Sequence, residues 1–258
     1  MVAAMDPRLE PDRRVFFLLE SPDNEASLLR CGTGRIAVAQ LNFDYLRATH
    51  ALLTGERQRE YQDYADAGAE VQRCLERGFA YRQRYSRHHG RVRGEADAPD
   101  SWDQVVNFIQ NHDSCGNRYL GQRLDALVGH ARQLRAATAL LLLHPGLPFL
   151  FMGQEWGAST PFHFFVDVPD ELGAAIDRGR RALFAEVDGA ILDSGRAPSS
   201  NDPEALRRSV LDWGELERPA ARRQLALVRE LLRLRARLLR LVPRAPAAAR
   251  VERAGGCF

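Results

Sequence analysis

The sequence of 258 residues is long enough for one large domain or two small ones. Hydrophobic residues make up 45% and charged residues 27%, as in an ordinary globular protein, and the formal net charge of +2 gives no support to nucleic-acid binding. No apolar run reaches membrane-spanning or signal-peptide length, and the four cysteines show no paired, metal-type spacing. We therefore expect a soluble cytoplasmic protein with reduced thiols and with no nucleic-acid or membrane partner.

Short apolar runs alternate with helical patterns along the chain. Four of the runs fit strands buried on both faces of a parallel sheet, at residues 15–19, 36–41, 105–109 and 147–152. Helical periodicity follows at residues 45–53, 67–81, 124–143 and 222–241, and a polar loop is expected at residues 86–100. Because strand, polar exit and helix recur four times, the pattern predicts an α/β fold, either a parallel sheet or part of a (β/α) barrel, with the strands adjacent in chain order.

Two further features have simple structural explanations. Residues 222–241 are rich in Arg and could bind nucleic acid, but their Leu residues recur at helical spacing, which favours a packing helix with a charged outer face. His88, His89 and His130 have no carboxylate or Cys partner at ligand spacing. We expect no metal and no cofactor.

Acidic residues stand at or just after the ends of the predicted strands. Glu20, Asp113 and Glu155 follow three of the strands, and Asp44 lies close behind the second. In a barrel such residues gather at one face, and convergent carboxylates suit glycosidic cleavage, where one group donates a proton and others stabilise positive charge at the anomeric carbon. Glu20 follows five apolar residues, where burial would favour its protonated form. Any one of these acids alone would more often cap a loop or helix.

Residues 105–118 carry a recognisable motif, Val-Val-Asn-Phe-Ile-Gln-Asn-His-Asp-Ser-Cys-Gly-Asn-Arg. An apolar strand ending in Asn-His-Asp resembles the strand-seven signature of the α-amylase superfamily, glycoside hydrolase family 13. The resemblance implies that His112 and Asp113 grip hydroxyls of the sugar under attack, with Asp113 as the third essential carboxylate. The following Gly-Asn-Arg points to one subgroup, the maltooligosyl-trehalose trehalohydrolases.

The resemblance to this subgroup extends over nearly the whole chain. Residues 17–21, Phe-Leu-Leu-Glu-Ser, resemble the end of strand five, which implies that Glu20 is the general acid/base, and Asn24 fits the Asn that follows it. Residues 39–56 resemble the strand-six region, and residues 151–158 the strand-eight exit. Trp156 would either stack on a sugar ring or pack in the core. Implied substrate contacts are Asp44, Asn111, His112, Arg118, Glu155 and Trp156.

This resemblance implies a fold, a domain division and a reaction. Residues 1–242 would form the C-terminal half of a (β/α)8 catalytic barrel, strands five to eight, and residues 243–258 would begin a truncated C-terminal β domain or linker. The reaction would be retaining hydrolysis of the α-1,4 bond next to the trehalose end of a maltooligosyl-trehalose, releasing trehalose.

The family's nucleophile has no counterpart at the expected place. It is an Asp at the end of strand four, in an Arg-x-Asp-Ala-x-His-like motif, and nothing of that form precedes Glu20. Residues 123–126, Arg-Leu-Asp-Ala, look similar but fall in a helical pattern, so we interpret Asp125 as a surface residue. Pro22, where the family prefers an acid, is a further departure. We expect the chain alone to be inactive; the alternative is a non-catalytic remnant or a carbohydrate-contacting fragment.

Overall fold

The computed structural model describes most of the chain, in two compact units. The described residues are 15–30, 36–192, 197–242, 245–246 and 250–252. The first unit comprises residues 1–108, 140–149 and 233–258, and the second comprises residues 109–139 and 150–232. No helix among the described residues combines the length and apolar character needed to cross a bilayer.

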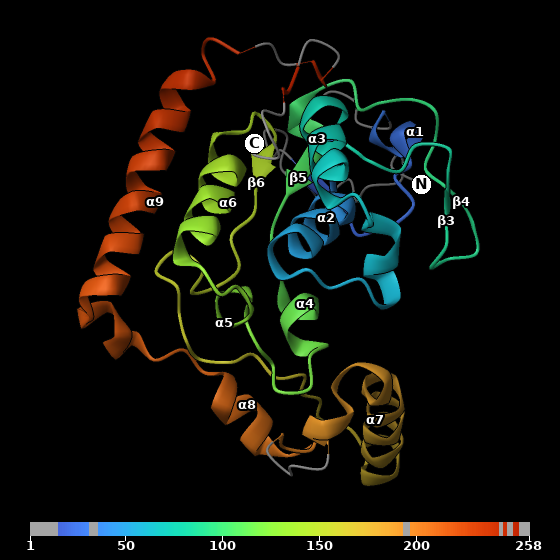
Figure 1. Ribbon diagram of the computed structural model, residues 1–258, viewed down its shortest axis with the longest axis vertical. Helices are drawn as coiled ribbons and strands as arrows, with labels where there is room; N and C mark the ends of the chain where they lie inside the picture. The colour runs from blue at the N-terminus through green and yellow to red at the C-terminus, as the bar shows by residue number, and fades with distance from the viewer. Residues whose placement is uncertain (1–14, 31–35, 193–196, 243–244, 247–249, 253–258) are drawn as a thin grey trace, which may run out of the picture. The chain divides into compact units, whose positions relative to one another are not determined.

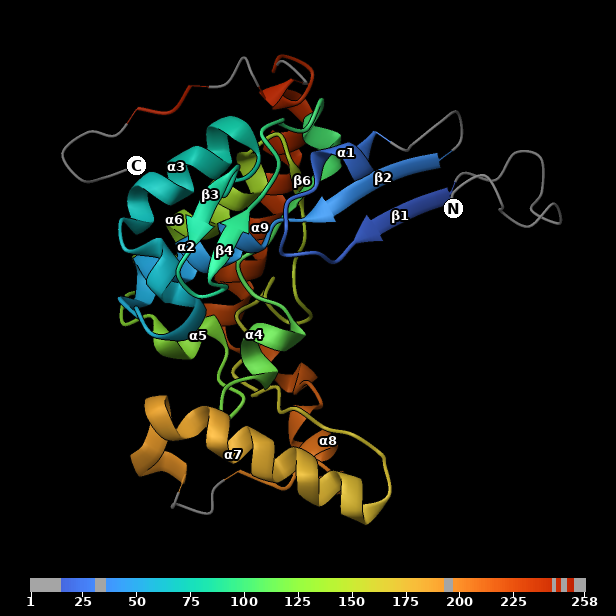
Figure 2. The same ribbon diagram turned by 90° about the vertical axis from the view of Figure 1, so that its right-hand side faces the viewer.

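A four-stranded parallel sheet forms the centre of the first unit. Its strands, in the order β1-β2-β5-β6, are β1 (Val15–Leu19), β2 (Ile36–Leu41), β5 (Val105–Asn107) and β6 (Leu147–Pro148). All three neighbouring pairs are parallel, and Figure 2 shows β1 and β2 side by side with the same direction. The predicted parallel sheet and its strand order are confirmed. β6 is shorter than the predicted strand at residues 147–152.

β1 lies at the edge of this sheet, and its apolar side chains are exposed. Phe16 is 63% exposed and Leu18 50%, whereas the sequence pattern predicted a strand buried on both faces. The difference arises because β1 pairs with β2 on one side and with no second strand among the described residues. An apolar edge of this kind is a template for further strand pairing.

Two capped helices follow β2. Helix α2 (Phe43–Thr54) begins at Asn42, whose side chain accepts a hydrogen bond from the Tyr45 N–H (3.1 Å), and ends at Gly55, which has a φ of 77°. Helix α3 (Ala67–Arg77) lies against α2 (Figure 1) and ends at Gly78, with a φ of 85°. Both predicted helices are confirmed, although the second stops earlier than residue 81 because of this left-handed glycine.

The remaining elements of the first unit are short. They are α1 (Ala26–Leu29), the 3-10 helices η2 (Arg59–Tyr64) and η3 (Trp102–Gln104), and the antiparallel hairpin of β3 (Arg84–Ser86) and β4 (Arg91–Arg93). The hairpin occupies residues 86–93 of the loop predicted at residues 86–100. Among the described residues, the core of this unit includes a cluster of Leu29, Val38, Phe79, Trp102 and Val105, and another of Phe43, Leu46 and Phe108.

The second unit is mainly helical, and two of its helices, α6 and α9, continue into residues of the first unit. They are α4 (His112–Gly116), α5 (Leu124–Leu127), α6 (Ala131–Leu143), α7 (Asp170–Leu192), α8 (Pro203–Ser209), η4 (Trp213–Glu217) and α9 (Pro219–Leu238). The single helix predicted at residues 124–143 is two helices, because Val128 at the end of α5 has extended backbone. The long helix α7 was not predicted. α9 confirms the Arg-rich amphipathic helix with slightly shifted ends.

One arginine of α9 departs from the expected charged outer face. Arg235 is buried and donates hydrogen bonds to backbone oxygens at the end of α6 and in the turn after it. The acceptors are Leu142 (3.2 Å), His144, Pro145 (3.1 Å) and Gly146 (2.8 Å). Leu142 lies in the last turn of α6 and the other three residues follow it, so Arg235 caps this helix end and the turn after it.

His144 is held in one tautomer at the same turn. Its Nδ1 accepts a hydrogen bond from the Gly146 N–H (3.0 Å), so the proton of the neutral ring is on Nε2, which donates to the Leu75 oxygen (3.1 Å). The ring packs edge-on against Trp102, with centroids 4.3 Å apart. Burial, together with the positive charge of Arg235, lowers the pKa of His144 from 6.5 to about 4.

We expect the stability of the protein to fall in acid because of this histidine. The unfolded chain binds a proton below pH 6.5 and the folded chain only below about pH 4. The contribution of His144 to the free energy of unfolding is therefore fully present above pH 6.5. It decreases as the pH falls to about 4, by about 3 kcal/mol at most. Denaturant unfolding between pH 7.5 and 4 measures this, and His144→Gln should lower stability at pH 7 but flatten the slope. An equally steep slope in His144→Gln would contradict the assignment.

Candidate active site

Glu20, the candidate acid/base, follows β1 directly, and its side chain is exposed. The burial expected from the preceding apolar run is absent, because β1 is an edge strand whose own side chains are exposed. The backbone after Glu20 is nevertheless fixed. Gln40 Nε2 donates to the Ser21 oxygen (3.0 Å), and Arg93 Nε donates to the Pro22 oxygen (3.0 Å).

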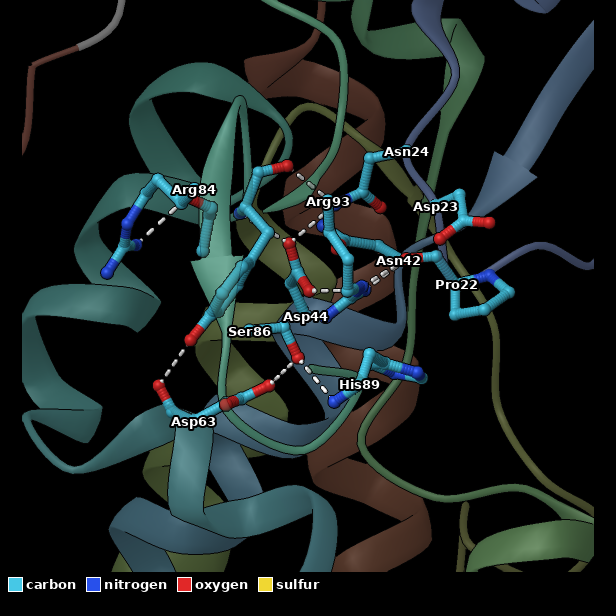
Figure 3. Close-up of polar contacts among 12 residues, drawn as sticks. Pro22, Asp23, Asn24, Asn42, Asp44, Asp63, Arg84, Ser86, His89 and Arg93 are labelled. Atoms are coloured by element: carbon cyan, nitrogen blue, oxygen red, sulfur yellow. Dashed lines mark hydrogen bonds and ion pairs between the residues drawn. The ribbon is translucent and has the colours of Figure 1, made fainter. Parts of the chain in front are cut away.

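Asp44 lies in the first turn of α2 and is fully buried. Figure 3 shows its carboxylate among side chains from several elements. Its hydrogen-bond donors are Asn24 Nδ2 (2.7 Å), the Tyr64 hydroxyl (2.7 Å), the Tyr81 N–H (2.7 Å) and Arg93 Nη2 (3.3 Å). Protein donors occupy both carboxylate oxygens, which favours a structural role for Asp44, and the sugar contact implied by the resemblance stays a prediction.

The charges around Asp44 support one another. Burial lowers the pKa of the Arg93 guanidinium, but Asp44, Tyr64 and Asp63 together more than offset this effect, so the pKa is raised and Arg93 stays charged. Burial, followed by the charge of Asp44, raises the pKa of Tyr64 well above its usual value, so its hydroxyl remains a donor. The result is an ion pair that is fully enclosed by protein.

A second buried acid, Asp63, shapes the hairpin that carries Arg93. Its carboxylate accepts hydrogen bonds from the Ser86 hydroxyl and from the Arg87 N–H (2.7 Å), and its backbone oxygen accepts one from the Tyr81 hydroxyl (2.7 Å). Sequence reasoning found neither Asp63 nor Arg93, because their partners are tens of residues away in the chain and form no local pattern.

In the second unit, the three residues of the Asn-His-Asp motif have different roles. Asn111 is buried and caps α4: its Oδ1 accepts from the Ser114 N–H (2.8 Å), and its own N–H donates to Ser114 Oγ (2.9 Å). The side chains of His112 and Asp113 are 60% and 48% exposed, with Nε2 and Oδ1 3.5 Å apart. Asn111 therefore positions the motif, whereas His112 and Asp113 are available to a ligand. Arg118 follows in the half-buried turn after α4.

The predicted strand-eight exit is a tight turn at residues 153–157. Gly153 has a φ of 84°, and a Cβ there would lie 2.7 Å from that of Ala158, so only glycine fits. Glu155 is partly exposed at this turn. Trp156 is buried against Ala158, Leu211 and Ala221, with its ring 5.1 Å from that of Trp213. Of the two explanations for Trp156, packing is the one that the structure favours.

Arg123 and Asp125 are both less exposed than the surface position that was expected for Asp125. Arg123 is buried, donates to the backbone oxygens of Thr160 (2.5 Å) and Met152 (2.8 Å), and stacks on the Phe151 ring. Asp125 lies on α5, as predicted, but it is half-buried, and burial raises its pKa. The similarity of residues 123–126 to the nucleophile motif therefore reflects a structural anchor on a helix.

The candidate residues fall into two groups. Glu20 and Asp44 belong to the first unit, and the other six, Asn111, His112, Asp113, Arg118, Glu155 and Trp156, belong to the second. The convergence of Glu20 and Asp113 in one cleft stays a prediction. Within the described part of the chain, no three His, Cys, Asp or Glu side chains gather as a metal-binding group.

Comparison with known proteins defines the class of fold to which the chain belongs. No protein-family model matches the chain. A crystal structure of an alpha-amylase-type protein from Salmonella typhimurium superposes with a TM-score of 0.80 and 38% identity, covering 88% of this chain and 39% of that one. The chain thus has the α/β fold, with a parallel sheet, of part of an alpha-amylase structure.

The homology also extends to one particular enzyme type. The malto-oligosyltrehalose trehalohydrolase of Arthrobacter ramosus is 40% identical over 89% of this chain, and that of Deinococcus radiodurans is 37% identical over 74%. The chain is homologous to the malto-oligosyltrehalose trehalohydrolases of the alpha-amylase family. It spans 40% and 32% of the length of these two relatives.

We expect the two tryptophans of the second unit to differ in their contribution to stability. Trp156→Ala should lower the free energy of unfolding by about 3–5 kcal/mol, because it empties a core position. Trp213→Ala is the matched control: Trp213 is 64% exposed, and its loss should cost less than about 1 kcal/mol. Denaturant unfolding of both variants measures this, and equal losses would contradict the assignment of Trp156 to the core.

Proposed function

We propose that this chain is the C-terminal half of the catalytic barrel of a glycoside hydrolase that releases trehalose from maltooligosyl-trehalose. The observation that carries the proposal is the 40% identity to a malto-oligosyltrehalose trehalohydrolase over 89% of the chain. The exposed Glu20 after β1 and the exposed His112–Asp113 pair after β5 are in keeping with it. The substrate would be a maltooligosyl-trehalose or a related α-glucan.

In this proposal the four parallel strands are strands five to eight of an eight-stranded barrel. The open edge of β1, with Phe16 and Leu18 exposed, supports pairing with a further strand. Residues 1–242 would then be half of the catalytic domain, and residues 243–258 would begin the next domain or a linker.

The proposed mechanism is retaining. A carboxylate nucleophile attacks the anomeric carbon while Glu20 gives its proton to the leaving oxygen, and a covalent glycosyl-enzyme forms. Water then attacks the same carbon, and Glu20 takes up a proton from it. His112 and Asp113 would bind hydroxyls of the reacting sugar, and Arg118 and Glu155 would add substrate contacts. The nucleophile must lie about 5–5.5 Å from Glu20. No strand end in this sequence supplies it, so it would come from the half of the barrel that this sequence does not represent.

A non-catalytic remnant is the second candidate function. It is favoured by the exposed apolar edge of β1, which invites pairing or aggregation in a chain that spans 40% of its relative's length.

Complementation separates the two candidates. The 258-residue chain is assayed for trehalose release alone and together with the N-terminal part of the Arthrobacter ramosus relative, which is expected to supply the nucleophile. We expect no release from the chain alone and release from the pair. Glu20→Gln in the pair should lower kcat by about a thousandfold, whereas Glu25→Gln, on the same loop, should change it less than about threefold.

Two results would overturn parts of this proposal. Activity of the chain alone that disappears in Glu20→Gln would mean that the nucleophile lies within these 258 residues. A folded but inactive pair would favour the remnant.

A further inference from the structure

The loop after Glu20 is held by side chains from distant parts of the first unit. Arg93, at the end of β4, directs both Nε and Nη2 to the Pro22 oxygen, with the Nε distance at 3.0 Å. Gln40, in β2, takes the neighbouring Ser21 oxygen at 3.0 Å. Two successive backbone oxygens directly downstream of Glu20 are therefore fixed by buried donors.

The same loop is held on its other side by Asp44. Asn24 Nδ2 donates to Asp44 Oδ2 (2.7 Å) and also lies 2.9 Å from the Tyr81 oxygen. Asp44 and Arg93 are themselves paired at 3.3 Å, and both side chains are fully buried. Arg93 therefore holds the Pro22 end of the turn and Asp44 holds the Asn24 end (Figure 3).

Asn24 adopts a conformation that needs this support. Its φ of 53° lies in the left-handed region, which residues other than glycine seldom occupy, although Asn tolerates it best. Such a conformation persists where surrounding contacts over-determine it, and such residues are concentrated at functional sites. Asn24 is also buried, with its side-chain nitrogen bound twice.

We propose that the Arg93–Asp44 pair is a positioning element for Glu20, holding residues 21–24 so that the carboxyl group at the end of β1 keeps one direction. The role of Glu20 as acid/base rests on the proposed function. The clamp depends on the planar fork of arginine, which reaches a carbonyl and a carboxylate together; the single ammonium of lysine does not.

A neighbouring pair on the same hairpin provides the control. Arg91 Nη2 lies 2.6 Å from Asp23 Oδ1, and both side chains are partly exposed. Exposed ion pairs of this kind contribute little to holding a backbone. Arg91 and Arg93 are thus two arginines of one strand that contact one loop, one at the surface and one buried.

Amide hydrogen exchange of the 258-residue chain tests the proposal without any assay of activity. Arg93→Lys should raise the exchange rates of the amides of residues 21–25 by about tenfold, with α2 within about twofold of wild type. Asn24→Gly fits the φ but removes the side-chain donor, so it should also raise the exchange rates of the amides of residues 21–25. Arg91→Lys should leave them within about twofold of wild type.

The outcomes are distinct. If Arg93→Lys and Asn24→Gly leave residues 21–25 at the wild-type rates, or loosen α2 equally, the pair is a general core contact and the proposal is overturned. If Arg93→Lys does not fold, Asn24→Gly alone decides, by the same criterion.

Kinetics of the complemented enzyme separate this proposal from the proposed function. Asn24→Gly should lower kcat for maltooligosyl-trehalose and leave KM unchanged. The decrease in kcat should be much smaller for a glycosyl fluoride, because its leaving group departs without a proton. An inactive wild-type pair defeats the proposed function and leaves the exchange result standing. An active pair in which Asn24→Gly retains the wild-type kcat overturns the positioning role.

Discussion

The ion pair between Asp44 and Arg93 is the constraint on which the first unit depends. Removing a carboxylate and a guanidinium from water costs several kcal/mol per ion, and their attraction offsets this only when the remaining donors and acceptors are also satisfied. The Asp44 carboxylate accepts these further hydrogen bonds from Asn24, Tyr64 and Tyr81. The pair therefore joins α2, η2, the β3–β4 hairpin and the loop after β1, and a movement of any of these elements would remove a buried hydrogen bond or the ion pair itself.

The parallel sheet could be predicted from the sequence because its signal is local. Runs such as residues 15–19 and 36–41 are apolar and bounded by polar residues, and parallel pairing follows from the helices between them. The exposure of β1 could not be predicted, because it depends on which strands flank it and not on its composition. The hairpin at Arg84–Arg93 was missed for a similar reason: its sequence is polar, and its position is set by contacts with Asp63 and Asp44.

The candidate site was partly predictable, through motifs rather than through geometry. His112, Asp113 and Glu155 have exposed or partly exposed side chains after the predicted strand ends, as expected. Asn111 belongs to the first of these motifs but caps helix α4, and Trp156 belongs to the second but packs in an apolar core. A motif identifies residues that a fold retains, and it does not separate those that touch a ligand from those that hold the others in place. That distinction needs burial and hydrogen-bond partners, which have no counterpart in a single sequence.

The cap that Arg235 provides has a consequence for the order of folding. Arg235 comes 89 residues after Gly146 in the chain, yet it satisfies the carbonyls between α6 and β6. During synthesis these carbonyls have no such partner until α9 emerges, so the last strand of the sheet is completed by one of the last helices to be made. Closing so long a loop carries an entropy cost before its contacts form. The end of the sheet opposite β1 should accordingly be among the last parts of the first unit to become native.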